Sequence, residues 1–178
     1  LVVSDHSEQL GMMMKLREGD PRIIADPEAK RIYDAMRAST TGDESAFEVI
    51  QEFILKMAHG QAMLSNRAVS EEVWQQSVRT ADDFNEPGVF TALIGFEWTS
   101  MPDSNNLHRV VIYADGADRA GALQPVSSND NEDPASLWDF MEAYEEATGG
   151  RIIAIPHNGN VSNGRMFETT DYSGAPMD

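Results

Sequence analysis

The sequence predicts a single α/β domain, residues 1–178, with mainly parallel strands and a helical insert at about residues 26–84. Short apolar segments of strand character alternate with helical ones in the order strand, helical region, strand, strand, helix, strand. A chain of 178 residues, 41% of them hydrophobic, is long enough for one core but not for two. Several of the predicted strands also end in a polar side chain, as strands do at the carboxyl edge of an α/β sheet.

The first predicted strand is Leu1–His6, which opens with Leu-Val-Val and ends in Asp5 and His6. Residues 7–11 are polar and predict a loop, and Met12–Leu16 predicts a short amphipathic turn. The chain lacks an initial methionine, begins inside a strand and stops without a closing element. We therefore expect it to be a piece of a longer protein.

The helical insert is predicted from caps and apolar periodicity. Asp26 followed by proline is typical of a helix start, with the aspartate as N-cap. A second helix is predicted from about residue 44 to 63, with Phe47, Ile50 and Ile54 facing inward. Ser70 is the predicted N-cap of a third helix, which ends near residue 84.

Beyond the insert, residues 89–98 and 107–113 predict two buried strands, and residues 114–132 a long polar connection without periodicity. Asp133 and the following proline predict another helix start, and this helix ends at Gly149. The apolar run at 152–155 predicts the last strand.

The composition restricts the function classes. Thirty acidic residues against 13 basic ones give a net charge of -17, which opposes binding to nucleic acid or to an anionic membrane. The absence of cysteine excludes disulfides and thiolate metal ligands. No apolar run approaches the about 18 residues of a transmembrane helix. We expect a soluble protein, cytoplasmic or periplasmic, without membrane or nucleic-acid partners.

Side chains able to bind a metal gather at the predicted strand ends. Asp5 and His6, Glu97 and His157 each close an apolar run, and His108 opens the strand after Glu97. If these strands are neighbours, their ends lie at one edge of the sheet, about 5 Å apart per strand. Imidazole and carboxylate ligands suit zinc, manganese and iron. The alternative is that each histidine simply hydrogen-bonds a loop carbonyl.

Other motifs do not predict a site. There is no Gly-x-Ser-x-Gly sequence and no glycine-rich phosphate loop. The run Asn129-x-Asn131-x-Asp133 resembles the start of a calcium loop, but Pro134 stands where that loop needs glycine. His59, alone on a predicted helix, is interpreted as a surface or packing residue.

Three motifs carry a family resemblance. Ser4-Asp5-His6, Gly95-Phe96-Glu97 followed by His108, and Ile155-Pro156-His157 resemble motifs of the polymerase-and-histidinol-phosphatase (PHP) superfamily of metal-dependent hydrolases. The longer phrases Ser-Asp-His-Ser-Glu-Gln-Leu-Gly, Gly-Phe-Glu-Trp-Thr and Ile-Pro-His-Asn-Gly-Asn-Val-Ser-Asn-Gly-Arg-Met-Phe resemble a large uncharacterised bacterial family related to that superfamily, domain-of-unknown-function family 3604. This resemblance spans essentially the whole chain.

The PHP resemblance implies metal ligation by His6, Glu97, His108 and His157, with Asp5 as a bridging or supporting acid. It also implies a distorted (β/α)7 barrel, of which this chain would supply the middle strands. The superfamily's opening His-x-His and closing Asp-x-His motifs have no counterpart here. About half of the expected ligands are therefore missing, and we expect the isolated chain to bind metal weakly and to be inactive.

The resulting functional hypothesis is a fragment of a metal-dependent hydrolase that uses zinc, manganese or iron to activate water. A small molecule, at superfamily level a phosphoester, is the expected substrate. Asn158 and Asn160 are candidates to orient it, and Arg165 is a candidate to pair with an anionic group. The alternative is a non-catalytic α/β binding or assembly module. Because a partial sheet leaves unpaired edges, we also expect a homo-oligomer.

Overall fold

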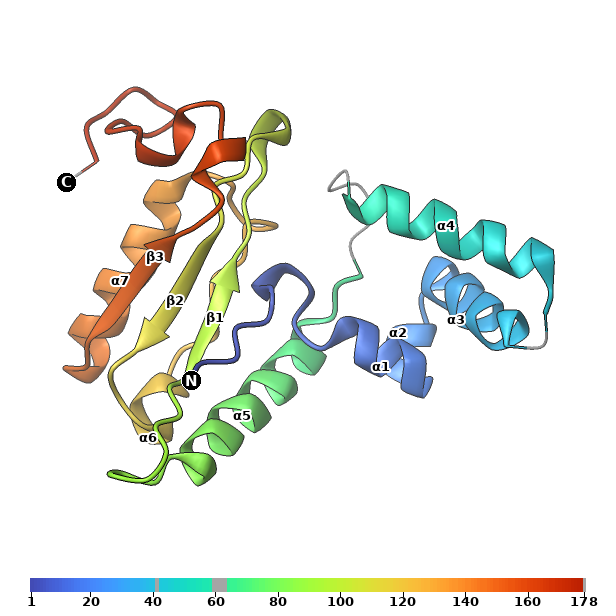
Figure 1. Cartoon of the computed structure of the whole chain (residues 1–178), viewed down its shortest axis with the longest axis horizontal. Coiled ribbons are helices and arrows are strands. Elements are labelled where there is room, and N and C mark those ends of the chain that lie inside the picture. Colours follow the sequence, from blue (N-terminus) through green and yellow to red (C-terminus); the bar gives the residue numbers. More distant parts are fainter. Residues whose placement is uncertain (41, 59–63, 178) are drawn as a thin grey trace. The chain divides into compact units, whose positions relative to one another are not determined.

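The computed structural model describes residues 1–40, 42–58 and 64–177. The chain forms two compact units, one of residues 9–71 and one of residues 1–8 together with 72–178. The first, called here the helical unit, holds α1 (Met12–Glu18), α2 (Pro21–Ile24), α3 (Pro27–Ser39), α4 (Glu44–Ala58) and the start of α5 (Arg67–Phe84) (Figure 1). The second, called here the sheet unit, holds the rest of α5, β1 (Gly95–Trp98), β2 (Arg109–Tyr113), α6 (Ala117–Ala120), α7 (Pro134–Thr148) and β3 (Ile152–Pro156).

The helical unit is built around α3. This helix contacts α4, α2 and α1, and its Ile32 is fully buried, as are Leu16 of α1 and Ala29. Phe53 of α4 is also buried, at 3% exposure. None of the helices in the described ranges combines the length and the apolar character that a membrane span requires.

The predicted helix starts at residues 26 and 133 are confirmed. A carboxylate oxygen of Asp26 accepts a hydrogen bond from Ala29 N at 2.9 Å, and one of Asp133 accepts from Ala135 N at 3.0 Å. Each aspartate thus satisfies one of the amide groups that a helix start leaves without a partner. Gly149 ends α7 at a φ of 64°, as predicted.

Two details of the predicted helices are wrong. Helix α5 starts at Arg67 instead of Ser70, because the side chain of Asn66 accepts the hydrogen bond of Val69 N at 3.2 Å. On α4, Phe47 and Ile54 were predicted to face inward but are 56% and 57% exposed. The buried residues are their neighbours Ala46 and Phe53. Two apolar stripes lie side by side on this helix, and periodicity alone does not determine which of them faces α3.

The predicted mainly parallel sheet and (β/α)7 barrel are wrong. The described residues are 51% helical, and their sheet has three short strands in the order β1-β2-β3, both pairs antiparallel. The reason lies in the predicted loop between β2 and α7. This connection, residues 114–132, begins beside the end of β2, where Asp115 accepts a hydrogen bond from Arg151 N. It runs to the opposite end of the strands, where Glu132 O accepts a hydrogen bond from Ser100 Oγ. This additional passage along the sheet reverses β3 relative to β2.

The segment before residue 7 runs parallel to β1. It forms the isolated bridges Val2 to Leu93 and His6 to Glu97, so this pair of neighbours has the predicted direction. Gly95 permits the close approach. A Cβ atom there would lie 2.5 Å from the carbonyl oxygen of Val111 and 2.7 Å from a methyl group of Val2.

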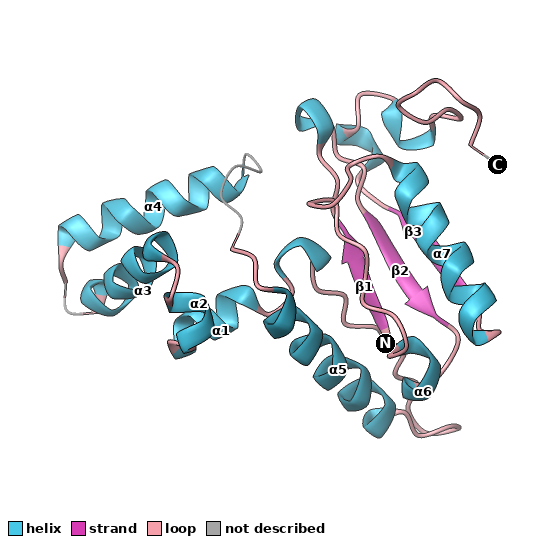
Figure 2. Ribbon diagram, turned by 180° about the vertical axis from the view of Figure 1, so that it is seen from behind, coloured by secondary structure: helices cyan, strands magenta, loops and turns pink. Residues whose placement is uncertain are grey.

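One face of the sheet forms the core of the sheet unit, under α7 (Figure 2). Phe96 and Tyr113 are buried there. Their rings pack against those of Trp74 of α5 and of Phe140 and Tyr144 of α7, with ring centroids 4.9–6.0 Å apart. Because side chains alternate along a strand, Glu97 lies on the opposite face. The strand register places it beside Val110, which in turn lies beside Ile155.

Candidate metal centre

The four predicted ligands meet at one edge of the sheet. Strand β2 is antiparallel to both neighbours, so the ends of β1 and β3 lie beside its start. His108 immediately precedes β2 and His157 immediately follows β3, and His157 N donates to the carbonyl of His108 at 3.2 Å. His6 is bridged to Glu97 from the other side. The antiparallel sheet therefore gathers the same side chains that a parallel sheet was expected to gather.

The centre of this group is one oxygen of Glu97. Its Oε1 lies 2.9 Å from His108 Nδ1, 3.1 Å from His157 Nε2 and 3.7 Å from His6 Nδ1. Two atoms that each lie about 2.0–2.2 Å from one zinc ion are roughly 3.0–3.5 Å from each other. The observed separations are close to that range. We call His6, Glu97, His108 and His157 the His/Glu cluster.

Burial within the His/Glu cluster is graded. The side chains of His108 and Glu97 are only 11% and 13% exposed, whereas those of His157 and His6 are 34% and 55% exposed. Neighbouring imidazoles meet edge to face, with centroids 5.8 Å apart for both His6 with His108 and His108 with His157. The cluster thus has a buried floor and a side that is accessible to solvent.

Two imidazole nitrogens have no hydrogen-bond partner among the described residues although both are buried, His108 Nε2 and His157 Nδ1. They are the ring nitrogens that do not face Glu97, because His108 presents Nδ1 and His157 presents Nε2 to its Oε1. A buried polar atom without a partner costs about 1–3 kcal/mol, so an ordered water at each of them would stabilise the fold. Burial is the main cause that lowers the pKa of His108, with the carboxylate of Glu97 acting in the opposite direction. A neutral imidazole keeps the lone pair that a metal needs, and this donor set suits zinc, manganese or iron.

Asp5 and Asn158, the two predicted catalytic residues, flank the cluster in sequence. The carbonyl of Asp5 accepts a hydrogen bond from Glu97 N at 2.9 Å, and the side chain is exposed. Asn158 is exposed with a φ of 58° and begins a 3₁₀ turn. Among the described residues, the ligand atoms of His6, Glu97 and His108 all lie within 4.8 Å of one another. This group lacks the Asp5 carboxylate, and it also lacks His157, whose Nε2 lies 3.1 Å from Glu97 Oε1. The structure therefore does not bring Asp5 or Asn158 into the cluster.

Arg165 and Arg109 are engaged elsewhere in the sheet unit. Arg165 lies 3.6 Å from Asp103, 3.4 Å from Glu168 and over the ring of Tyr172. An anionic ligand would therefore have to compete with these partners for the guanidinium of Arg165. The buried guanidinium of Arg109 donates to the carbonyl of Met166 at 2.9 Å, which ties the start of β2 to the loop after His157.

Sequence reasoning missed Thr99 and Glu8. Thr99 Oγ1 lies 2.5 Å from His6 Nδ1. Thr99 comes two residues after Glu97, so strand alternation could have placed it on the same face. Glu8 is buried, and its carboxylate accepts hydrogen bonds from Thr99 N and Ser128 N at 3.2 and 2.9 Å. Nothing in its sequence context indicated burial.

The model of the family described as protein of unknown function (DUF3604) matches residues 1–178. The chain belongs to this family. Comparison with curated proteins and with solved structures gives no match.

Proposed function

We propose that His6, Glu97, His108 and His157 bind a divalent metal ion and that this site serves a metal-dependent hydrolase related to the PHP superfamily. The observation that carries the proposal is the convergence of His108 Nδ1 and His157 Nε2 on one oxygen of Glu97, at 2.9 and 3.1 Å, with the imidazole of His6 beside that of His108. The net charge of -17 also favours a cation. Zinc and manganese are the first candidates, and iron fits the same ligands.

The chemistry of the proposed site follows from its residues. These residues would hold the ion, and a bound divalent metal would supply the Lewis acidity that generates hydroxide from water near neutral pH. Glu97 and His108, both largely buried, hold the floor of the site in place. His6 and His157 are more exposed and leave an approach from solvent. Asp5 and Asn158 remain proposed catalytic residues, because their exposed side chains flank two of the ligands in sequence.

The proposed substrate is a small-molecule phosphoester. This part of the proposal rests on the resemblance to the PHP superfamily, because a fold and a ligand set do not by themselves define a substrate. The open side of the His/Glu cluster supports a small soluble substrate, and the acidic surface opposes nucleic acid.

Isothermal titration of the purified chain with zinc tests the proposal. We expect one class of sites, weak because part of the superfamily's ligand set is absent from this chain, and we expect His108→Ala and His157→Ala to weaken it further. His59→Ala is a matched control because His59 is the remaining histidine of the chain. Equal zinc binding in all three variants would contradict the ligand assignment. A melting temperature that neither zinc nor a chelator changes would favour the alternative, a non-catalytic binding or assembly module.

A further inference from the structure

We infer that Glu8 is a positioning residue that holds His6 in the geometry of the metal site. This inference rests on the proposed function, because it assigns His6 as a ligand. Glu8 lies in a 3₁₀ turn, Ser7–Gln9, directly after His6. Its side chain is buried, with 7% exposure for the residue, although it is an acid in a polar segment.

The carboxylate of Glu8 joins three segments of the sheet unit. Its Oε1 accepts hydrogen bonds from Thr99 N at 3.2 Å, from Ser128 N at 2.9 Å and from Ser7 Oγ at 3.1 Å. The carbonyl of Glu8 also accepts one from Asn129 Nδ2 at 3.0 Å. A single buried oxygen therefore fixes the turn after His6 to the end of β1 and to the loop around residue 128.

Thr99 connects this anchor to the imidazole of His6. The Thr99 hydroxyl lies 2.5 Å from His6 Nδ1, and the Thr99 carbonyl accepts a hydrogen bond from Ser128 Oγ. With the proton on Nδ1, His6 donates to this hydroxyl and keeps the lone pair of Nε2 for a metal. Because the His6 side chain is 55% exposed, packing restricts it little. Its orientation depends on Thr99, and the position of Thr99 depends on Glu8.

The test combines zinc titration with variants at Glu8 and Thr99. Groups that support a metal ligand typically change metal affinity by about 10–100-fold when removed, and we expect a loss in that range for Glu8→Ala. Glu8→Gln keeps an oxygen that can accept the two backbone hydrogen bonds, so it should retain most of the affinity. Thr99→Val removes the hydroxyl with little change in shape and should reproduce the loss.

Asp115→Ala is the matched control. Asp115 is another carboxylate that anchors backbone, since it accepts from Arg151 N at 2.7 Å and from the Tyr144 hydroxyl at 3.0 Å. It follows β2 at the edge of the sheet opposite the His/Glu cluster. We expect Asp115→Ala to lower the melting temperature as Glu8→Ala does, but to leave zinc affinity unchanged. Equal losses of zinc affinity in these two variants would reduce Glu8 to a general structural role and overturn the inference.

Histidine-ring NMR of the metal-free chain separates this inference from the proposed function. Glu8→Ala and Thr99→Val should shift the ring signals of His6 more than those of His157, whether or not zinc binds. Unchanged His6 signals overturn the positioning role even if the wild type binds zinc. If the wild type does not bind zinc but the two variants still shift the His6 signals, the proposed function is contradicted, whereas the contacts that hold His6 are supported.

Discussion

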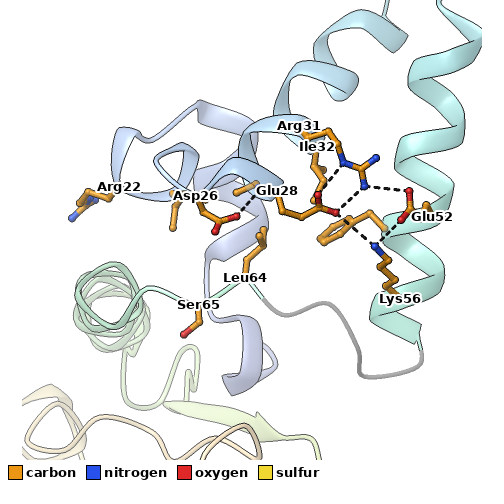
Figure 3. Close-up of a pocket in the computed structure, with 12 residues that line it drawn as sticks. Arg22, Asp26, Glu28, Arg31, Ile32, Glu52, Lys56, Leu64 and Ser65 are labelled. Atoms are coloured by element: carbon orange, nitrogen blue, oxygen red, sulfur yellow. Dashed lines mark hydrogen bonds and ion pairs between the residues drawn. The ribbon is translucent and has the colours of Figure 1, made fainter.

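The helical unit and the sheet unit each contain a cluster of four ionisable side chains, but the charges balance in only one of them. In the helical unit, Glu28, Arg31, Glu52 and Lys56 line one side of a pocket of about 820 Å³ (Figure 3). Arg31 lies 2.8 Å from Glu28 and 3.2 Å from Glu52, and Lys56 lies 2.6 Å from Glu52. Two cations face two anions, and each group has partners.

The His/Glu cluster differs because one carboxylate faces three imidazoles that are uncharged when neutral. The charge network of the helical unit is complete without a ligand, whereas the His/Glu cluster gains a missing positive charge from a cation. The comparison shows that a metal site is indicated by unbalanced, partly buried donors and not by the number of ionisable groups.

Removal of Glu97 should have the largest effect. Because its Oε1 is shared by the three histidines, Glu97→Ala should weaken zinc binding by more than the about 10–100-fold that is typical of a supporting residue. Titration calorimetry measures this loss. Glu142→Ala, an exposed carboxylate of α7, is the control and should bind zinc like the wild type. Similar affinities for both variants would remove the distinction between the two clusters.

Zinc should stabilise the sheet unit. A ligand at 100 times its Kd stabilises the folded state by about 2.7 kcal/mol, which raises the melting temperature by roughly 5–10 °C in a chain of this size. Differential scanning calorimetry with zinc and then with a chelator should show this rise and its reversal. His108→Ala should show neither. A zinc-induced rise in that variant would place the ion elsewhere.

Loss of a helix cap should have an intermediate effect, confined to stability. Asp26→Ala removes the acceptor for Ala29 N at the start of α3 and should cost about 1 kcal/mol in the free energy of unfolding. Urea denaturation followed by circular dichroism measures it. Zinc affinity should stay at the wild-type value, because Asp26 lies in the helical unit. A weaker zinc affinity would show that the metal site depends on that unit.

The charge network of the helical unit should show the smallest effect, visible in acid. Hydrogen bonds to Arg31 and Lys56 lower the pKa of Glu28 and Glu52, respectively, below 4.5. Since the folded-state pKa is the lower one, this stabilisation is present above pH 4.5 and is lost as the pH falls through the folded-state values. The network is exposed, so salt should weaken it.

Glu52→Gln should therefore reduce the acid dependence of the melting temperature between about pH 5 and 3, measured by circular dichroism. Glu142→Gln controls for the loss of one surface charge. A Glu52→Gln profile identical to that of the wild type would show that the network contributes nothing.

Local features of the fold followed from the sequence, whereas long-range ones did not. Asp26 and Asp133 marked helix starts because a cap depends on neighbours within three residues. Strand direction depends on the path of residues 114–132, where no periodicity indicates a passage along the sheet. The inward stripe of α4 was wrong because two apolar stripes were available and only the packing against α3 selects one.

The proximity of the candidate ligands was predicted, although the direction of the strands that carry them was not. His6, Glu97 and His157 were predicted to meet because each closes an apolar run, and this needs only that the three runs point the same way. The N-terminal segment, β1 and β3 do so, with β2 reversed between the last two. Glu8 was missed because its burial arises from contacts with residues 99 and 128, about 90 and 120 positions away in sequence.

X-ray absorption spectroscopy of the zinc-loaded chain tests the central claim most directly. The account predicts zinc bound by three imidazoles and a carboxylate, with metal–nitrogen distances of roughly 2.0–2.1 Å. Glu97→Ala should lose this spectrum, and His59→Ala should keep it. A spectrum with oxygen ligands alone, or one unchanged in Glu97→Ala, would contradict the His/Glu cluster as a metal centre.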